Sequence, residues 1–216
     1  MIIRKHYRAY IANENSAWQQ ALEADKEVVK AAVADGKCMM VALYKHKNML
    51  FVYMEALEEG LEAEVLFPTL SMYLAPWPKM DGFSTWAKMY HIYYHALPDE
   101  VRFMEGRKEK KVRRGRIARL YEDKLFSYVY YHKAIVDEGL LEGDMYQSIA
   151  LQDDILFSYF EEPKILTHVK EDIKEDSKVI EDWLAVDPES HFDHEFTGGG
   201  NFVFIEELFS VGKEDL

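Results

Sequence analysis

The chain has little of what exported, disulfide-stabilised or membrane-spanning proteins depend on. Among its 216 residues there is one cysteine, Cys38, so no disulfide can form within the chain. No apolar run reaches the roughly 18 residues that cross a bilayer. The start of the chain has no apolar stretch followed by a cleavage site, as a signal peptide would. We therefore expect a soluble, cytoplasmic protein with no membrane partner.

Basic charge is also scarce. There are 26 Lys and Arg against 39 Asp and Glu, and the resulting net charge of −13 disfavours nucleic acid as a partner. No glycine-rich phosphate loop is expected, because the glycines at 198–200 do not lead from a strand into a helix. What the chain does have is a 49% share of apolar residues, which is enough for a buried core.

One short stretch occurs twice, 106 positions apart. Residues 49–55 read Met-Leu-Phe-Val-Tyr-Met-Glu, and residues 155–161 read Ile-Leu-Phe-Ser-Tyr-Phe-Glu. A strand-like segment and a short polar turn precede each copy, at 38–44 and at 144–151, so each copy predicts a hairpin. Two similar hairpins half a chain apart indicate an internal duplication.

The remaining pattern predicts the order β-α-β-β-α-β in both halves. In the first half we expect a strand at 2–11, a helix at 16–34, an aromatic helix at 83–96 and a strand at 101–105. In the second half we expect a strand at 114–121, helices at 123–141 and 163–184, and a strand at 202–211. Three prolines indicate that residues 68–82 are an irregular insertion.

The only strong shift in composition lies at residues 106–116, which hold seven basic side chains and one acidic one. This predicts two ferredoxin-like repeats, 1–106 and 114–216, joined by a basic linker at 107–113. Each repeat would leave one face of an antiparallel sheet uncovered, and the simplest cover is the other sheet. The predicted fold class is therefore α+β, an intramolecular pseudo-dimeric α+β barrel, present as a monomer or as a homodimer.

Titratable side chains on the apolar face of each first helix are the main candidates for chemistry. When Gly36 is aligned with Gly143, Asp25 falls opposite His132, and burying such groups is costly unless they are satisfied or used. Tyr128 lies one turn before His132, and a Tyr–His pair can hold and protonate a sugar or carbonyl oxygen. The alternative is a core histidine that donates to a backbone carbonyl, with Tyr128 packed beside it.

Several aromatic residues are candidates for the floor of a sugar site. Trp86 and Met89 lie three residues apart on the predicted aromatic helix, and Trp183 lies on the matching helix of the second half. Packing in the core is the alternative for all three.

Two pairs of histidines are spaced so that a metal site has to be considered. His91 and His95 lie four apart on the predicted aromatic helix, but no third ligand follows at metal spacing. His191 and His194 lie in a predicted loop, which we interpret as solvated. We therefore expect no metal.

Each half resembles an L-rhamnose mutarotase, a family of the dimeric α+β barrel group. The likeness rests on short motifs: Met1-Ile-Ile-Arg-Lys5, Ala42-Leu43-Tyr44 and the hairpin after it, Trp86-Ala-Lys-Met89, Tyr128-x-x-x-His132, and Glu206-Glu207-Leu208-Phe209. The first half departs from the family at Ala21 and Asp25, where the family has Tyr and His. In the second half, Gln152 stands where the first half has Tyr44.

The resemblance implies a cofactor-free interconversion of the anomers of a deoxy sugar, or sugar binding by a degenerate relative. His132 would then move a proton at the ring or anomeric oxygen. Tyr128 and Tyr44 would orient hydroxyl groups. In the first half, Asp25 would occupy the place that His132 has in the second half. Trp86 or Trp183 would stack on the ring. The expected partner is a monosaccharide, with no cofactor.

Two other functions stay open. The same architecture hosts monooxygenases and haem-handling proteins, in which His91 or His132 would be the haem ligand; this is an analogy between folds. The third option is a non-catalytic module that binds a small molecule or another protein. Whether the chain is an enzyme is left open, with an isomerase of the aldose mutarotase type favoured.

Overall fold

A computed structural model describes residues 1–13, 15–80, 82–109, 111–170 and 177–216. The chain divides into two compact units. Unit 1 comprises Met1–Met89, Pro98–Lys110 and Ile205–Leu216, and unit 2 comprises Tyr90–Leu97 and Lys111–Phe204. These units do not follow the predicted boundary at the basic segment, because each takes a strand from the other half of the sequence.

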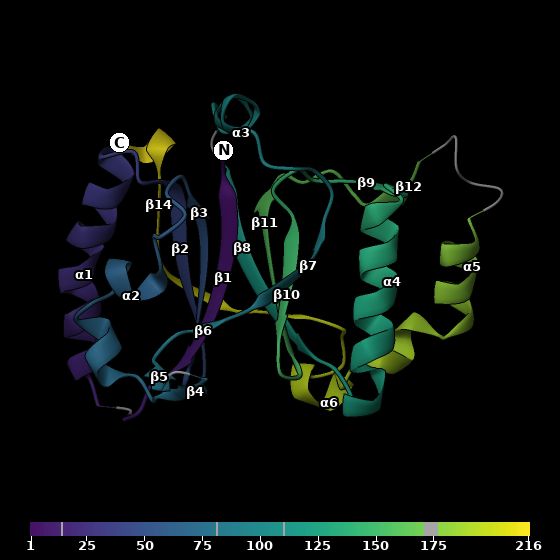
Figure 1. Ribbon diagram of the computed structural model, residues 1–216, viewed down its shortest axis with the longest axis horizontal. Helices are drawn as coiled ribbons and strands as arrows, with labels where there is room; N and C mark the ends of the chain where they lie inside the picture. The colour runs from purple at the N-terminus through teal and green to yellow at the C-terminus, as the bar shows by residue number, and fades with distance from the viewer. Residues whose placement is uncertain (14, 81, 110, 171–176) are drawn as a thin grey trace. The chain divides into compact units, whose positions relative to one another are not determined.

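Unit 1 is built on an antiparallel sheet with the strand order β14-β2-β3-β1-β6. Its strands are β1 (Ile3–Tyr10), β2 (Cys38–His46), β3 (Met49–Ala56), β6 (Ala87–Lys88) and β14 (Glu206–Gly212). Helix α1 (Ala17–Ala34) covers one face of the sheet (Figure 1). Trp18, Leu22 and Val29 recur on one side of α1 and are buried against Tyr7 and Val52 of the sheet. The strand at 2–11, the helix at 16–34 and the first hairpin are thus confirmed.

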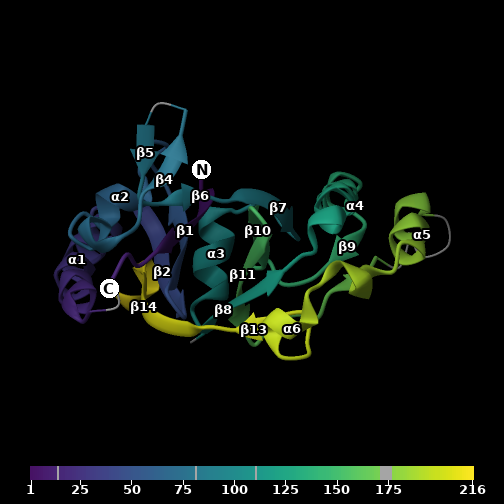
Figure 2. The ribbon, with the colours of Figure 1, turned by 90° about the horizontal axis from the view of Figure 1, so that it is seen from below.

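The rest of unit 1 consists of short elements. They are α2 (Ala63–Leu66), the 3-10 turn η1 (Leu70–Tyr73), β4 (Trp77–Lys79), β5 (Gly82–Ser84), α3 (Glu100–Gly106) and η4 (Lys213–Asp215). The predicted insertion at 68–82 thus contains a turn and part of a β4–β5 hairpin, which projects from the unit (Figure 2). The strand predicted at 101–105 is wrong. Asp99 caps a helix there, because its side chain accepts the N–H of Arg102 at 2.8 Å.

The predicted aromatic helix at 83–96 is also wrong, because the segment forms strands. It contains β5, β6 and β7 (Tyr90–Tyr94), and no helix. Lys88 is paired with Tyr7 of β1, whereas His91 is paired with Ala150 of β10. Tryptophan, tyrosine and isoleucine are enriched in strands, and here the sheet provides the backbone partners that this preference needs.

Unit 2 is built on an antiparallel sheet with the order β13-β8-β11-β10-β7. Its further strands are β8 (Val112–Arg119), β10 (Ser148–Gln152), β11 (Ile155–Glu162) and β13 (Val203–Phe204). Helix α4 (Leu125–Asp137) covers one face, and α5 (Lys178–Ala185) packs beside α4 (Figures 1 and 2). The smaller elements are η2 (Glu122–Lys124), β9 (Leu141–Glu142), β12 (His168–Val169), η3 (Pro188–His191) and α6 (His194–Thr197).

The helix predicted at 163–184 is wrong over its first part. Strand β12 lies within that range and pairs with β9. Residues 171–176 lie outside the described residues, and α5 begins only at Lys178, where the Ser177 hydroxyl accepts the N–H of Ile180. The second hairpin and the strand after the basic segment are confirmed. The last predicted strand is in fact two, β13 in unit 2 and β14 in unit 1.

The two sheets have corresponding orders. The central strands β2-β3-β1 of unit 1 match β10-β11-β8 of unit 2, and β14 and β6 match β7 and β13 at the edges. Within the repeated strand, the Tyr53 hydroxyl donates to Glu55 at 2.9 Å, and the Tyr159 hydroxyl donates to Glu161 at 2.7 Å. An α+β fold with antiparallel sheets is therefore confirmed. The descent of both units from one duplicated ancestor stays a prediction.

Within the described residues, no helix is both long and apolar enough to cross a membrane.

Candidate functional site

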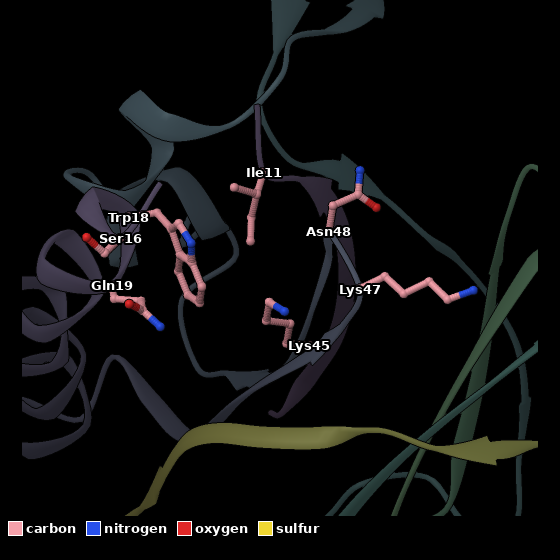
Figure 3. Close-up of a pocket in the computed structure, with 7 residues that line it drawn as sticks. All are labelled: Ile11, Ser16, Trp18, Gln19, Lys45, Lys47 and Asn48. Carbon is pink, nitrogen blue, oxygen red and sulfur yellow. The ribbon is translucent and has the colours of Figure 1, made fainter. Parts of the chain in front are cut away.

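The cavities lined by described residues include one in each unit. The first lies in unit 1 where α1 begins; its volume is about 300 Å³. Trp18 and Ile11 face it, Lys45 lies nearby, and the side chain of Lys47 extends away (Figure 3). The described residues that line it include no acid and no histidine, so this pocket holds no acid–base pair near neutral pH.

The second cavity, in unit 2, has a volume of about 460 Å³. This lies within the usual range for a small-molecule site. Side chains from β7, α4, β10 and α5 line it. Most of its wall is apolar, including Ile135, Ile149, Ile180, Phe192 and Phe202. A smaller set of its lining residues is polar: Tyr93, Tyr128, His132, Gln147, Thr167 and Asn201. An apolar wall with a few polar groups is typical of a site for a small organic molecule.

His132, Tyr128 and Trp183 meet at this cavity. The rings of His132 and Tyr128 are stacked, with centroids 3.9 Å apart. The ring of Trp183 lies in a T-shaped arrangement with both rings, and its centroid is 5.1 Å from that of His132 and 5.9 Å from that of Tyr128. Three residues predicted from the sequence as site residues are therefore neighbours, although their roles stay predictions.

The chemical state of His132 follows from its contacts. Its Nδ1 lies 2.9 Å from the carbonyl oxygen of Tyr128, and a carbonyl can only accept, so the proton is on Nδ1. Burial lowers the pKa of His132 to about 4, against the smaller opposing effect of this bond. At neutral pH the ring is uncharged and Nε2 carries a lone pair. Within the described residues, nothing forms a hydrogen bond with Nε2.

Three more polar groups at the cavity have little or no partner. The Tyr128 hydroxyl and the buried Gln147 Oε1 make no hydrogen bond to any described residue. The Tyr93 hydroxyl has one long contact, 3.5 Å to His95 Nε2. Burial raises the pKa of Tyr93 and Tyr128, so both hydroxyls keep their protons at neutral pH. Buried polar groups are normally paired, so these atoms point to a bound molecule with donors and acceptors of its own.

Tyr93 and Gln147 were not predicted as site residues. The ring centroids of Tyr93 and His132 are 5.4 Å apart, because β7 joins the sheet of unit 2. Residues 90–94 are rich in Tyr and Ile, which are enriched in strands, and this is the signal that could have indicated a strand. Gln147 precedes β10, and its position gives no sequence signal for a site.

The other predicted site residues lie in unit 1. Asp25 is buried, and its carboxylate accepts the N–H groups of Thr69 at 3.2 Å and Leu70 at 2.7 Å. Trp86 is buried, packs on Phe67 and donates from Nε1 to Ser71 Oγ at 2.9 Å. The side chains of Met89 and Tyr44 are buried as well. Their proposed contacts with a substrate stay predictions.

The register that paired Asp25 with His132 is wrong. At the end of α1, Gly36 has a φ of 73°, and at the end of α4, Gly139 has a φ of 63°. The flanking hydrogen bonds also match, with Lys37 N bonded to Ala32 O and Leu140 N to Ile135 O. Gly36 therefore corresponds to Gly139, rather than to Gly143, and Asp25 corresponds to Tyr128.

The predicted correspondence of Tyr44 with Gln152 is also wrong, because the strand pairing differs from the one expected. Tyr44 is paired with Phe51 on the neighbouring strand, whereas Gln152 is paired with Ile155. The residue paired with Phe157, the equivalent of Phe51, is Ala150. Tyr44 therefore corresponds to Ala150.

The histidines considered for metal binding have other surroundings than predicted. His91 and His95 lie on and just after a strand. His191 lies in η3, is fully buried, and has its Nε2 2.7 Å from Ser127 Oγ, so the prediction of a solvated loop is wrong for this residue. Across the described ranges, no group of three or more His, Cys, Asp or Glu residues has a metal-binding arrangement.

No protein-family model matches the chain, and no curated protein matches it. A candidate monooxygenase from Fusobacterium nucleatum subsp. nucleatum ATCC 25586 is 8% identical over 97% of this chain and 94% of its own, with a TM-score of 0.44. One from Lactobacillus acidophilus NCFM is 8% identical over 97% of this chain and 96% of its own, with a TM-score of 0.41. An anthrone oxidase-like protein is 9% identical over 99% of this chain and 97% of its own, with a TM-score of 0.37. Likenesses this distant carry no functional information, so function rests on the chemistry of the cavity.

Proposed function

We propose that unit 2 binds a compact, mainly apolar ring compound that carries a hydroxyl group, and that His132 Nε2 accepts the proton of this hydroxyl. The observation that supports the proposal is one cavity lined by both His132 and Tyr128, with Nε2 and the phenol oxygen unpaired within the described residues. The apolar wall favours a ring, because burying apolar surface contributes about 25 cal/mol per Å².

When His132 removes the proton of the bound hydroxyl, the site can catalyse a reaction as well as bind a ligand. The anion formed from a phenol or enol is rich in electrons, and the hydroxyls of Tyr93 and Tyr128 can donate to its oxygen. In the oxygenase alternative, dioxygen oxidises this anion. A ring carbon loses its hydrogen and the hydroxyl loses its proton. One oxygen atom of dioxygen becomes a carbonyl on that ring carbon, and the other combines with the two hydrogens to form water.

Isomerisation of a deoxy sugar is the second proposal. It is favoured by the meeting of Tyr128, His132 and Trp183, since the mutarotase-like motif and the aromatic floor share one cavity. A sugar presents hydroxyl groups around most of its ring, however, and each needs a partner when it is buried. The largely apolar wall therefore fits a hydroxylated aromatic ring better.

We also propose that the chain is a duplicated unit. The corresponding strand orders and the repeated Tyr–Glu hydrogen bonds support this origin. The predicted barrel formed by the two sheets stays a prediction.

Calorimetric titration with 2-naphthol tests the binding proposal. Wild type should bind it, and His132→Gln should bind at least about tenfold more weakly, because the basic imidazole Nε2 that accepts the proton of the ligand is lost. The matched control is His168→Gln, which changes an exposed histidine outside the cavity lining. No binding to wild type, or equal binding to His132→Gln, would contradict the proposal.

Three assays then distinguish the reactions. Dioxygen uptake with 2-naphthol, lost in His132→Gln, supports the oxygenase. Anomer exchange of L-rhamnose or L-fucose faster than in buffer, measured by saturation-transfer NMR and lost in His132→Ala, supports the isomerase. A Soret band on adding haem, absent in His132→Ala, would instead make His132 a haem ligand.

A further inference from the structure

Arg116 of β8 lies against Phe202, one of the residues that line the unit 2 cavity, and no carboxylate among the described residues pairs with it. The carbon at the centre of its guanidinium is 4.3 Å from the ring centroid of Phe202, which lines the cavity. The same carbon is 5.2 Å from the ring of Phe160. Within the described residues its only hydrogen bond is a long one, from Nε to Ser158 Oγ at 3.4 Å.

The neighbouring arginines of β8 differ in this respect. Arg114 pairs with Glu162 at 2.8 Å, and Arg119 pairs with Asp193 at 3.1 Å. No carboxylate among the described residues pairs with Arg116. An arginine left without an acid is unexpected in a chain with 39 acidic and 26 basic side chains.

A second cation lies close to Arg116. Lys164 shares the ring of Phe160 with Arg116, with Nζ 4.4 Å from the ring centroid, and the two like charges repel, whereas Asp144 and Glu162 attract Lys164. The Tyr128 hydroxyl also interacts with Arg116, but it is neutral at physiological pH. A half-buried cation without a counter-charge is costly, and an anion that entered the cavity would offset this cost.

We propose that the ligand of unit 2 is an organic acid whose carboxylate pairs with Arg116 while its ring lies against Phe202. This inference rests on the proposed function and adds the charge of the ligand to it. A guanidinium matches a carboxylate with two parallel hydrogen bonds, which fixes the orientation of the ring as well as its affinity. A bound carboxylate also favours the protonated form of a nearby histidine, so it would make His132 a stronger base.

The test compares two probes that differ only in charge, 6-hydroxy-2-naphthoic acid and 6-hydroxy-2-naphthamide. In calorimetric titrations at pH 7, wild type should bind the acid at least about tenfold more tightly than the amide. Arg116→Gln should remove this preference, and Arg116→Lys should keep part of it. Arg114→Gln is the matched control, since it removes a cation two residues away on the same strand, and it should leave the preference unchanged.

Thermal unfolding without ligand provides a second readout. Arg116→Gln loses the contacts with Phe202 and Phe160, but it also removes a half-buried cation that has no acidic partner among the described residues, so its unfolding temperature should stay close to that of wild type. Equal affinity of wild type for acid and amide, or a preference that persists in Arg116→Gln, would overturn the inference and leave the proposed function standing. If neither probe binds and 2-naphthol does not bind, the proposed function fails too.

Discussion

His132 and Tyr128 stack face to face on α4, with ring centroids 3.9 Å apart and with Nδ1 of the histidine donating to the tyrosine carbonyl at 2.9 Å. They are four positions apart in the sequence, so one helical turn places them on the same side of the helix. The backbone bond fixes the tautomer of His132 and leaves Nε2 as its acceptor. The stack therefore offers an acceptor and a phenol hydroxyl to the same cavity.

Replacing Tyr128 by Phe should weaken binding without weakening the fold. The hydroxyl has no partner among the described residues, so Tyr128→Phe should change the free energy of unfolding by less than about 0.5 kcal/mol. Affinity for 2-naphthol, measured by calorimetry, should fall about tenfold because the ligand loses a hydrogen bond. Tyr130→Phe, on the exposed side of the same helix, should change neither quantity. A large loss of stability in Tyr128→Phe would show that the hydroxyl is structural.

His132 should make stability depend on pH. Its pKa is about 4 in the folded protein against 6.5 in the unfolded chain. Between these values the unfolded chain binds more protons, so stability falls as the pH drops from 6.5 towards 4. The shift corresponds to a loss on the order of 3 kcal/mol.

Urea unfolding at pH 7 and pH 4 measures this loss. His132→Gln should lose less stability than wild type over that interval, and the exposed His168→Gln should match wild type. Identical losses in wild type and His132→Gln would mean that His132 titrates normally.

Asp25→Ala should destabilise unit 1 and leave the unit 2 cavity intact. The substitution leaves the N–H groups of Thr69 and Leu70 without their acceptor, at a cost of about 2–4 kcal/mol. Urea unfolding should show this loss, and Glu23→Ala, exposed on the same helix, should not. Affinity for 2-naphthol should be unchanged. Weaker binding with unchanged stability would instead support the predicted contact between Asp25 and substrate.

Arg107→Met should be strongly destabilising. Arg107 donates two hydrogen bonds to Glu55, both at 2.8 Å, and both side chains are buried. Burial, the largest single effect, would raise the pKa of Glu55, but the charges of Arg107 and Arg4 and the hydrogen bonds from Arg107 and Tyr53 together outweigh it and lower the pKa. Removing the cation leaves a buried carboxylate, at a cost of about 3–5 kcal/mol in urea unfolding.

Exposed Arg102→Met on α3 is the matched control for this pair. The double variant Arg107→Met with Glu55→Gln should recover part of the loss, because residue 55 is then no longer a buried carboxylate without Arg107. If it recovers nothing, the cost comes from packing rather than from the charge.

Local patterns predicted part of the fold and of the site. The helical spacing of Trp18, Leu22 and Val29 is enough to define α1, because one face of that helix meets a core. The spacing of Tyr128 and His132 predicts that they are neighbours, and one of the two interpretations of His132 includes its bond to a backbone carbonyl. Each of these inferences used residues within a few helical turns.

The incorrect predictions concern segments whose structure depends on pairing with residues far along the chain. Residues 90–94 became a strand because β10 supplies their hydrogen-bond partners, far along the chain. The false alignment of Gly36 with Gly143 arose because both glycines follow a predicted helix. Only the backbone geometry at Gly139 shows where α4 ends.

By itself the sequence determined the hairpins, α1, the start of α4 and the stack of Tyr128 on His132, since short-range periodicity and turn residues act within a few positions. Tertiary structure decided which sheet β7 and β14 join. It also brought Tyr93, Gln147 and Trp183 to one cavity, and it placed Arg116 against Phe202 with no carboxylate partner among the described residues. These features depend on distances between residues far apart in the chain, and such distances exist only once the core has packed.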